Sequence, residues 1–335
     1  MNKRTTLSLI ISFLCFAVVF VIALMVGKYS ISIADFFKAL FSNDAAFATQ
    51  RSVILKLRLP RTIVAGLTGI ALSVSGLLYQ EVFQNKLTSP DLLGVSSGAA
   101  VGASLAIILG LGSAFVSIFA FVAGVGTVLL TMLLSRLFKN GSSITLVLAG
   151  IIVGGFMSAL LSVIKFLADP MTTLASITYW LMGSFENSTM SYVWILLPIV
   201  AICCIFLIVV SWRINIVAMG REQAQTKGVP YAVYRILIIG VATLLTATAV
   251  SFSGTIGWIG LVIPHVVRTM VGSDARRTIP LCITFGGVFM IIVDILSRSF
   301  TNQEIPLSAV TGVVGTIIFV IILITKRRDF YAYKD

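Results

Sequence analysis

The chain is built from apolar runs that are long enough to cross a membrane, separated by short polar segments. A helix needs about 20 apolar residues to cross the hydrocarbon core of a bilayer. Hydrophobic residues make up 58% of the chain, charged residues 11%, and the mean hydropathy is +1.07, which no soluble globular surface accommodates. Backbone polar groups in lipid must be satisfied within the segment. We therefore expect an all-α membrane protein, with residues 1–335 forming a single polytopic domain.

Ten spans fit the chain when each takes about 20 residues and a short connection. The runs cover residues 7–27, 62–83, 94–110, 115–136, 143–166, 191–212, 231–252, 257–271, 279–297 and 306–325. The first run is longer than the apolar region of a signal peptide and lacks a small-x-small cleavage site, so we expect it to be retained as a span.

The distribution of basic residues predicts the orientation. Lys3 and Arg4 place the amino terminus in the cytoplasm, and ten crossings return the carboxyl terminus there. Four further basic groups then fall on the cytoplasmic side: Arg136 with Lys139, Arg213 with Arg221 and Lys227, Arg276 with Arg277, and residues 326–328. We expect a multi-pass protein of the cell membrane with both termini in the cytoplasm.

One loop breaks this pattern. Residues 28–61, which the span count places outside, carry six basic residues against two acidic ones: Lys28, Lys38, Arg51, Lys56, Arg58 and Arg61 against Asp35 and Asp44. Basic residues normally stay in the cytoplasm, so a basic outer loop indicates an acidic partner outside. This pattern favours a transporter that is served by an external delivery protein.

The sequence lacks the residues that several kinds of chemistry require. No GxxxxGK[ST] loop occurs, so an ATPase that drives transport must be a separate polypeptide. The chain has one histidine, His265, and neither an HExxH motif nor a paired-carboxylate constellation, which argues against an enzyme. The four cysteines lie in apolar runs without metal-ligand spacing, and we expect neither a bound metal nor a cofactor in this chain. The net charge of +12 comes from short scattered groups, which does not indicate nucleic-acid binding.

Small residues recur at helical spacing along two spans. The second span carries Gly66, Gly69, Ser73 and Gly76, and the fifth carries Gly150, Gly154, Ser158 and Ser162, with Lys165 one turn further on. Such stripes either allow close helix packing or line a polar path. Lys165 is expected near the outer surface of the membrane. An ionisable side chain there is either part of a site or extends to the membrane interface. The fifth-span residues are our candidates for a translocation path.

The cytoplasmic segment 213–230 holds a short run of helix formers that ends at Gly228. This pattern predicts a surface helix with a glycine cap, which could transmit force from a soluble partner or be an ordinary solvated loop. Our candidates for that coupling are Gly220, Arg221, Glu222, Ala224 and Gly228.

Several motifs, in order along nearly the whole chain, resemble those of one family. They are residues 58–61 (RLPR), 69–80, 85–102 (NKLTSPDLLGVSSGAAVG), 179–184 (YWLMGS), 220–228 (GREQAQTKG) and 257–268 (GWIGLVIPHVVR). The chain resembles the FecCD family, the BtuC-like permease subunits of type II ABC importers for iron siderophores, haem and vitamin B12.

The resemblance implies about ten spans in each of two permease subunits around a central path. It also implies an ABC ATPase dimer docked below at residues 219–228, and an extracellular or periplasmic substrate-binding protein or lipoprotein docked above. Arg58, Arg61 and Arg298 would face the glutamates of that binding protein. ATP would be used by the partner subunit.

We therefore expect the permease of an ATP-driven importer, most simply for a ferric siderophore, that works by alternating access. Haem and cobalamin remain alternative substrates. An ion-coupled secondary transporter is a further alternative, which the sparse intramembrane carboxylates disfavour. A homodimer and a heterodimer of permease subunits both satisfy a central path.

Overall fold

A computed structural model describes residues 3–29, 31–41, 44–138 and 143–325 of the chain, and these residues form helices joined by short connections, without a strand. The two termini, and with them the expected basic group at 326–328, lie outside the described residues, as does Lys139. The side chains of Lys3 and Arg4 are likewise not described.

The helices follow one another in this order: α1 (Lys3–Met25), α2 (Ile33–Phe41), α3 (Ala48–Ser52), α4 (Leu59–Val82), α5 (Val95–Ile108), α6 (Ser113–Leu137), α7 (Ser143–Leu167), α8 (Thr173–Met182), α9 (Met190–Ala218), α10 (Arg221–Thr226), α11 (Tyr231–Ser253), α12 (Ile259–Val271), α13 (Ala275–Ser299) and α14 (Leu307–Thr325). Two 3-10 turns, η1 (Ala45–Phe47) and η3 (Pro90–Leu93), and one π-helical turn, η2 (Val53–Arg58), lie in the connections.

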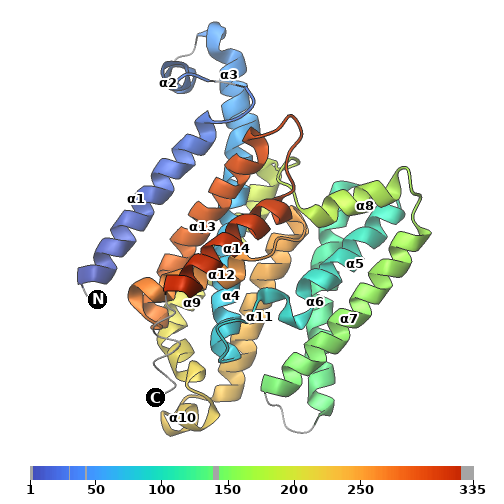
Figure 1. Cartoon of the computed structure of the whole chain (residues 1–335), viewed down its shortest axis with the longest axis vertical. Helices are drawn as coiled ribbons and strands as arrows, with labels where there is room; N and C mark the ends of the chain where they lie inside the picture. The colour runs from blue at the N-terminus through green and yellow to red at the C-terminus, as the bar shows by residue number, and fades with distance from the viewer. Residues whose placement is uncertain (1–2, 30, 42–43, 139–142, 326–335) are drawn as a thin grey trace.

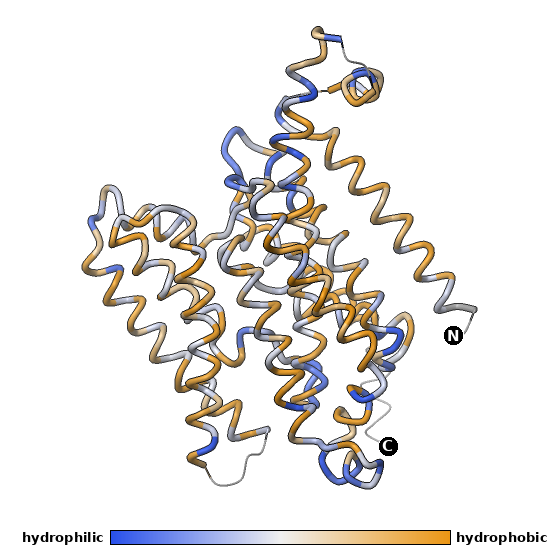
Figure 2. Tube along the Cα trace, turned by 180° about the vertical axis from the view of Figure 1, so that it is seen from behind, coloured by the Kyte–Doolittle hydropathy of each residue, from blue (hydrophilic) through white to orange (hydrophobic). Residues whose placement is uncertain are grey.

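The expected spans are confirmed in place and type. Among the described residues, eight helices are long and apolar enough to cross a membrane, and two shorter apolar helices, α5 and α12, occupy the third and eighth expected positions. Helix α12 has only 13 residues and contains Pro264. Hydrophilic residues gather at the two ends of the molecule and hydrophobic residues cover the helices between them (Figure 2). The described residues form an all-α fold with about ten membrane helices.

Helix α4 is the centre of the molecule. It packs against α9, α11, α12 and α13, while α5, α6 and α7 form a second group that meets the first through α11 (Figure 1). The most apolar window of α4 is 89% buried, against 17% for the windows of α1 and α7. A helix rich in glycine, alanine and serine fits this place because small residues let neighbouring backbones approach closely.

Two loops of the expected topology contain helices instead. Residues 28–61 were expected as an outer loop, yet α2, α3 and η2 occupy much of this segment, and a continuous helical stretch runs from Ala45 to Val82. The outer segment 168–190, also expected as a loop, contains α8. In Figure 1, α2 and α3 lie at one end of the molecule and α10 at the other, and α8 lies at the upper end of the group formed by α5, α6 and α7.

Gly76 lies where the backbones of α4 and α12 are close together. A Cβ atom placed on Gly76 would lie 1.9 Å from the carbonyl oxygen of Gly260. We expect Gly76→Ala to force α4 and α12 apart and to lower the stability of the protein by about 1–3 kcal/mol or more. The matched control is Gly240→Ala on α11, because nothing lies within 4 Å of a Cβ at Gly240. Thermal unfolding in detergent measures both, and equal midpoints for the two variants would contradict the close approach.

Candidate functional site

At the end of α4 that we expect to face outside, Arg58 contacts the end of α1. Its guanidinium donates to the carbonyl oxygens of Leu24 at 3.0 Å, Met25 at 2.6 Å and Tyr29 at 2.5 Å. The last carbonyl groups of a helix have no hydrogen-bond partner within the helix. A cation at this end also interacts favourably with the negative end of the helix dipole. Arg58 therefore caps α1 against the start of α4.

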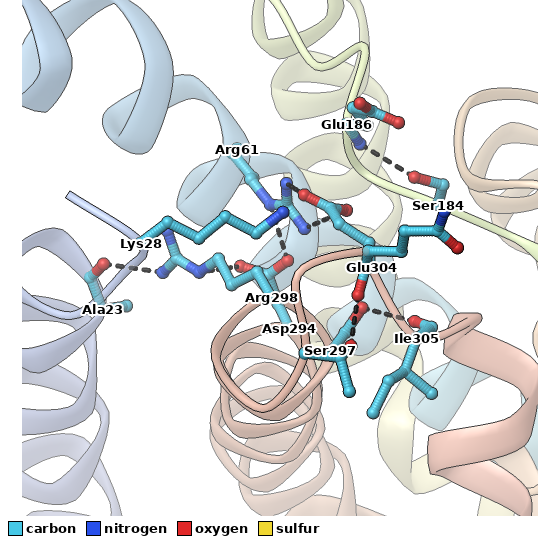
Figure 3. A network of polar contacts seen from close by, with 12 residues as sticks. Ala23, Lys28, Arg61, Ser184, Glu186, Asp294, Ser297, Arg298, Glu304 and Ile305 are labelled. Carbon is cyan, nitrogen blue, oxygen red and sulfur yellow. Dashed lines mark hydrogen bonds and ion pairs between the residues drawn. The ribbon is translucent and has the colours of Figure 1, made fainter.

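Arg61, one turn further along α4, joins two acidic residues. Its Nε donates to Asp294 Oδ1 at 2.7 Å, and its two terminal nitrogens bind both carboxylate oxygens of Glu304, at 2.6 and 2.9 Å (Figure 3). Asp294 lies on α13 and Glu304 in the following connection. A bidentate pair of this kind is both strong and geometrically specific.

Arg298 completes this outer charge network of Arg58, Arg61, Asp294, Arg298 and Glu304. It lies one turn after Asp294 on α13, with Nε 3.3 Å from Asp294 Oδ2, and it donates to the Ala23 carbonyl oxygen at 2.7 Å (Figure 3). The network thus joins α1, α4, α13 and the connection before α14.

The three arginines assigned to binding-protein docking are internal residues in this arrangement. Arg58, Arg61 and Arg298 are 5%, 9% and 5% exposed, and Asp294 is fully buried. Their guanidinium groups already have intramolecular partners, so they shape the outer surface rather than extend from it. Their docking role stays a prediction. The partners in the network, Asp294 and Glu304, were not among our candidates, although the four-residue spacing of Asp294 and Arg298 was a usable local signal.

The candidate path residues divide into two halves along α7. Gly150 is buried, and a Cβ there would lie 2.2 Å from the carbonyl oxygen of Leu92, so this half packs closely on η3. Ser158 and Ser162 are exposed, and their hydroxyls donate to carbonyl oxygens of their own helix. Gly154 and Lys165 are partly exposed. The exposed half presents a polar stripe on the outside of a single subunit.

A cavity of about 540 Å³ opens beside α8 and is lined largely by hydroxyl and aromatic side chains, among them Ser117, Tyr179, Trp180, Ser188 and Tyr192. Tyr179 donates to Glu186 at 2.5 Å. Burial and then the Glu186 carboxylate raise the pKa of the Tyr179 phenol, which is a proton donor at neutral pH. A neutral cavity with many hydroxyl groups suits a polar solute.

At the other end, α10 is the exposed helix that the sequence predicted. It begins after Gly220 and is followed by Gly228, with φ values of +101° and +70°, a region that favours glycine. Ala224 and Val229 are buried beneath the helix, while Arg221 and Glu222 are exposed. The five coupling candidates therefore form one anchored element with its charged side chains in solvent.

Polar contacts near α10 connect the ends of α9 and α12 to the end of α4. The Gln84 side-chain nitrogen donates to the Ala218 carbonyl oxygen at the end of α9, at 3.1 Å. Nearby, Arg268 of α12 donates to Glu81 at 2.8 Å and also to Gln80, both near the end of α4. Because α10 follows α9, the Gln84 contact places the end of α9, from which the chain continues into α10, against the base of α4.

Asp274 fixes the start of α13 beside α9. It accepts from the backbone N–H of Arg276 at 3.0 Å and from the side-chain nitrogen of Asn215 at 2.7 Å. Burial alone would raise the pKa of Asp274, but these hydrogen bonds and the nearby arginines outweigh it and lower the pKa. The carboxylate therefore stabilises the fold above its ordinary pKa, and this contribution is lost as the pH falls through the lowered value.

We expect Asp274→Ala to lower stability by about 1 kcal/mol at neutral pH through the loss of this cap. The difference from the wild type should shrink below about pH 4. Asp274→Asn should retain most of the stability, because asparagine also caps helices. Unfolding midpoints across pH measure these effects, and a difference that is unchanged at low pH would contradict them.

Comparison with known proteins identifies the family. The model of the FecCD transport family matches residues 15–325. The chain belongs to the FecCD transport family. A FecCD relative, the molybdate import system permease protein MolB of Haemophilus influenzae, is 36% identical, with 92% of each chain covered. A probable iron chelatin transport system permease protein of Helicobacter pylori is 34% identical, covering 92% of this chain and 95% of the relative.

A solved structure has the same fold. An inward-facing transporter of the metal-chelate ABC type superposes with a TM-score of 0.86 at 34% identity, covering 95% of this chain and 98% of that one. This FecCD protein is therefore a membrane permease subunit of an ABC importer. The resemblance drawn from the motifs is confirmed.

Proposed function

We propose that this FecCD permease imports a ferric siderophore with the help of a separate ABC ATPase dimer and an external substrate-binding protein. The observation that carries the proposal is the likeness, over nearly the whole chain, to a metal-chelate transporter. The iron chelatin permease supports the same substrate class. Haem and cobalamin are the alternatives among bulky chelates.

The two ends of the molecule support the direction of the mechanism. An exposed helix with arginine and glutamate side chains, α10, suits a docking cleft on the ATPase. Closure of the ATPase would move α10, and the links from α9 and α12 to α4 would carry this movement into the core. The end with α10 then faces the cytoplasm, together with both termini, and the outer charge network faces the binding protein of a cell-membrane importer.

A second permease subunit would complete the path. The exposed serine stripe of α7 is polar on an otherwise apolar surface, which favours cover by another subunit over contact with lipid. Either a second copy or a paralogue could provide that cover. The path would then run between the two α7 stripes, and this chain would perform no covalent chemistry.

Molybdate is the second candidate substrate, because the MolB relative imports it. Uptake of radiolabelled ferric siderophores, haem, cobalamin and molybdate by cells with and without this gene distinguishes the candidates. Loss of siderophore uptake alone is the expected result. Loss of molybdate uptake would move the assignment to the oxyanion, and unchanged uptake of every compound in cells without redundant systems would refute an importer of these substrates.

A further inference from the structure

A second cavity lies at the α10 end of the molecule and shares no lining residue with the cavity beside α8. It has a volume of about 270 Å³ and lies between α6, α7, α10 and α11. Its lining residues are Met132, Ser135, Arg136, Leu146, Arg221, Tyr231, Ala232, Arg235, Ile236 and Ile239. Three of these are arginines, each from a different helix, and none is acidic.

The arginines suit an anion with several oxygen atoms. Within the described part of the chain, no ion pair joins Arg136 or Arg221 to a carboxylate. The guanidinium of Arg235 lies 6.0 Å from the centre of the Tyr231 ring, which helps to hold it at the cavity. Guanidinium groups bind phosphate through paired N–H donors. Three guanidinium groups around one cavity offer more N–H donors than one carboxylate group can accept, which favours a phosphate group as the ligand.

The position of the cavity points to the membrane surface. Arg136 lies in the last turn of α6, and Tyr231 and Arg235 lie in the first turns of α11, so the positive groups are at the ends of membrane-spanning helices. The first turn of α11 adds the positive end of its helix dipole. The remaining lining includes Leu146, Ile236 and Ile239, which would contact an apolar chain. Basic pockets between helices at the cytoplasmic surface suit the headgroups of anionic lipids.

We propose that the cavity bordered by Arg136, Arg221 and Arg235 binds a phosphate group, supplied by the headgroup of an anionic phospholipid. The location of this site on the cytoplasmic side rests on the proposed function, whereas the binding of phosphate by its arginines does not. A bound headgroup would join α6 and α7 to α10 and α11 and would make the position of the coupling helix sensitive to the lipid.

Native mass spectrometry of the purified full-length protein tests this proposal without any transport measurement. The protein is exposed in separate arms to phosphatidylglycerol, to phosphatidylcholine and to inorganic phosphate. We expect retention of phosphatidylglycerol over phosphatidylcholine, and Arg136→Gln with Arg235→Gln should weaken that retention by roughly tenfold or more. The control is Lys86→Gln with Arg276→Gln, which removes the same charge from exposed residues outside the cavity and should retain the lipid.

Each remaining result of this experiment would contradict one part of the proposal. Tight binding of inorganic phosphate with no preference among lipids would overturn the lipid source. Equal retention of phosphatidylglycerol by the cavity variant and the wild type would overturn the site. If the cavity variant does not fold, the wild type alone decides, because equal retention of the two lipids contradicts the proposal. Loss of ATPase assembly in the cavity variant, with no lipid or phosphate bound by the wild type, would assign the arginines to acidic residues of a partner.

Discussion

Charge reversal of Arg61 is expected to disrupt the outer end of the protein, and not only to weaken an encounter with a binding protein. Arg61→Glu would place a third carboxylate beside Asp294 and Glu304 in a site where Arg61 is 9% exposed and Asp294 is fully buried. Removal of one partner from a buried ion pair leaves an uncompensated charge and costs about 3–5 kcal/mol. We expect a large fall in the yield of monodisperse protein and in the unfolding midpoint.

The matched control is Lys56→Glu, which reverses an exposed charge in the same helical stretch and should leave the midpoint unchanged. A second variant, Arg61→Glu with Glu304→Arg, restores one pair and should recover part of the loss. If Arg61→Glu instead unfolds like the wild type and fails only to respond to loaded binding protein, the residue acts in docking. Loss of uptake by itself does not distinguish these roles, so stability is measured first.

Disruption of α10 is expected to separate ATP hydrolysis from transport. Gly228→Pro imposes a φ near −65° where the structure has +70°, and it removes the N–H that donates to Gln225 at 3.0 Å. Glu222→Arg reverses an exposed charge on the same helix. In the double variant we expect uptake to fall roughly tenfold or more, because like charges opposed across an interface cost more than about 1.4 kcal/mol.

The ATPase in the double variant should hydrolyse ATP at a rate that no longer responds to loaded binding protein. Arg276→Glu, which reverses an exposed charge at the same end but outside α10, should retain coupling. Paired measurements of uptake and phosphate release in the assembled complex give the result. Normal stimulation of the ATPase in the double variant would remove α10 from the coupling role.

Local patterns in the sequence were enough to predict the spans and the exposed helix α10. Length and hydropathy determine a membrane helix, so the long runs coincide with helices, and Gly228 follows α10 as expected of a helix cap. The helices in segments 28–61 and 168–190 were missed because α2, α3 and α8 have only 9, 5 and 10 residues, which is too short for the membrane-length runs on which the prediction relied.

The partners of the arginines could not be predicted in the same way. Arg61 meets Asp294 and Glu304 across 233 and 243 residues of sequence, and nothing local indicates such a contact. A basic loop with few acidic residues suggested an external partner, which stays a prediction, and for Arg61 the chain also provides acidic groups itself. Among the described ion pairs of the outer charge network, the one between Asp294 and Arg298, one helical turn apart, lay within reach of local reasoning.

The most direct test of the account is substrate uptake into proteoliposomes that contain this permease with its partner subunits, with loaded binding protein outside and ATP at the α10 face. We predict uptake that requires hydrolysable ATP and continues when ionophores collapse the proton and sodium gradients. Uptake that proceeds without ATP and stops with the ionophores would contradict an ATP-driven permease and would indicate a secondary transporter.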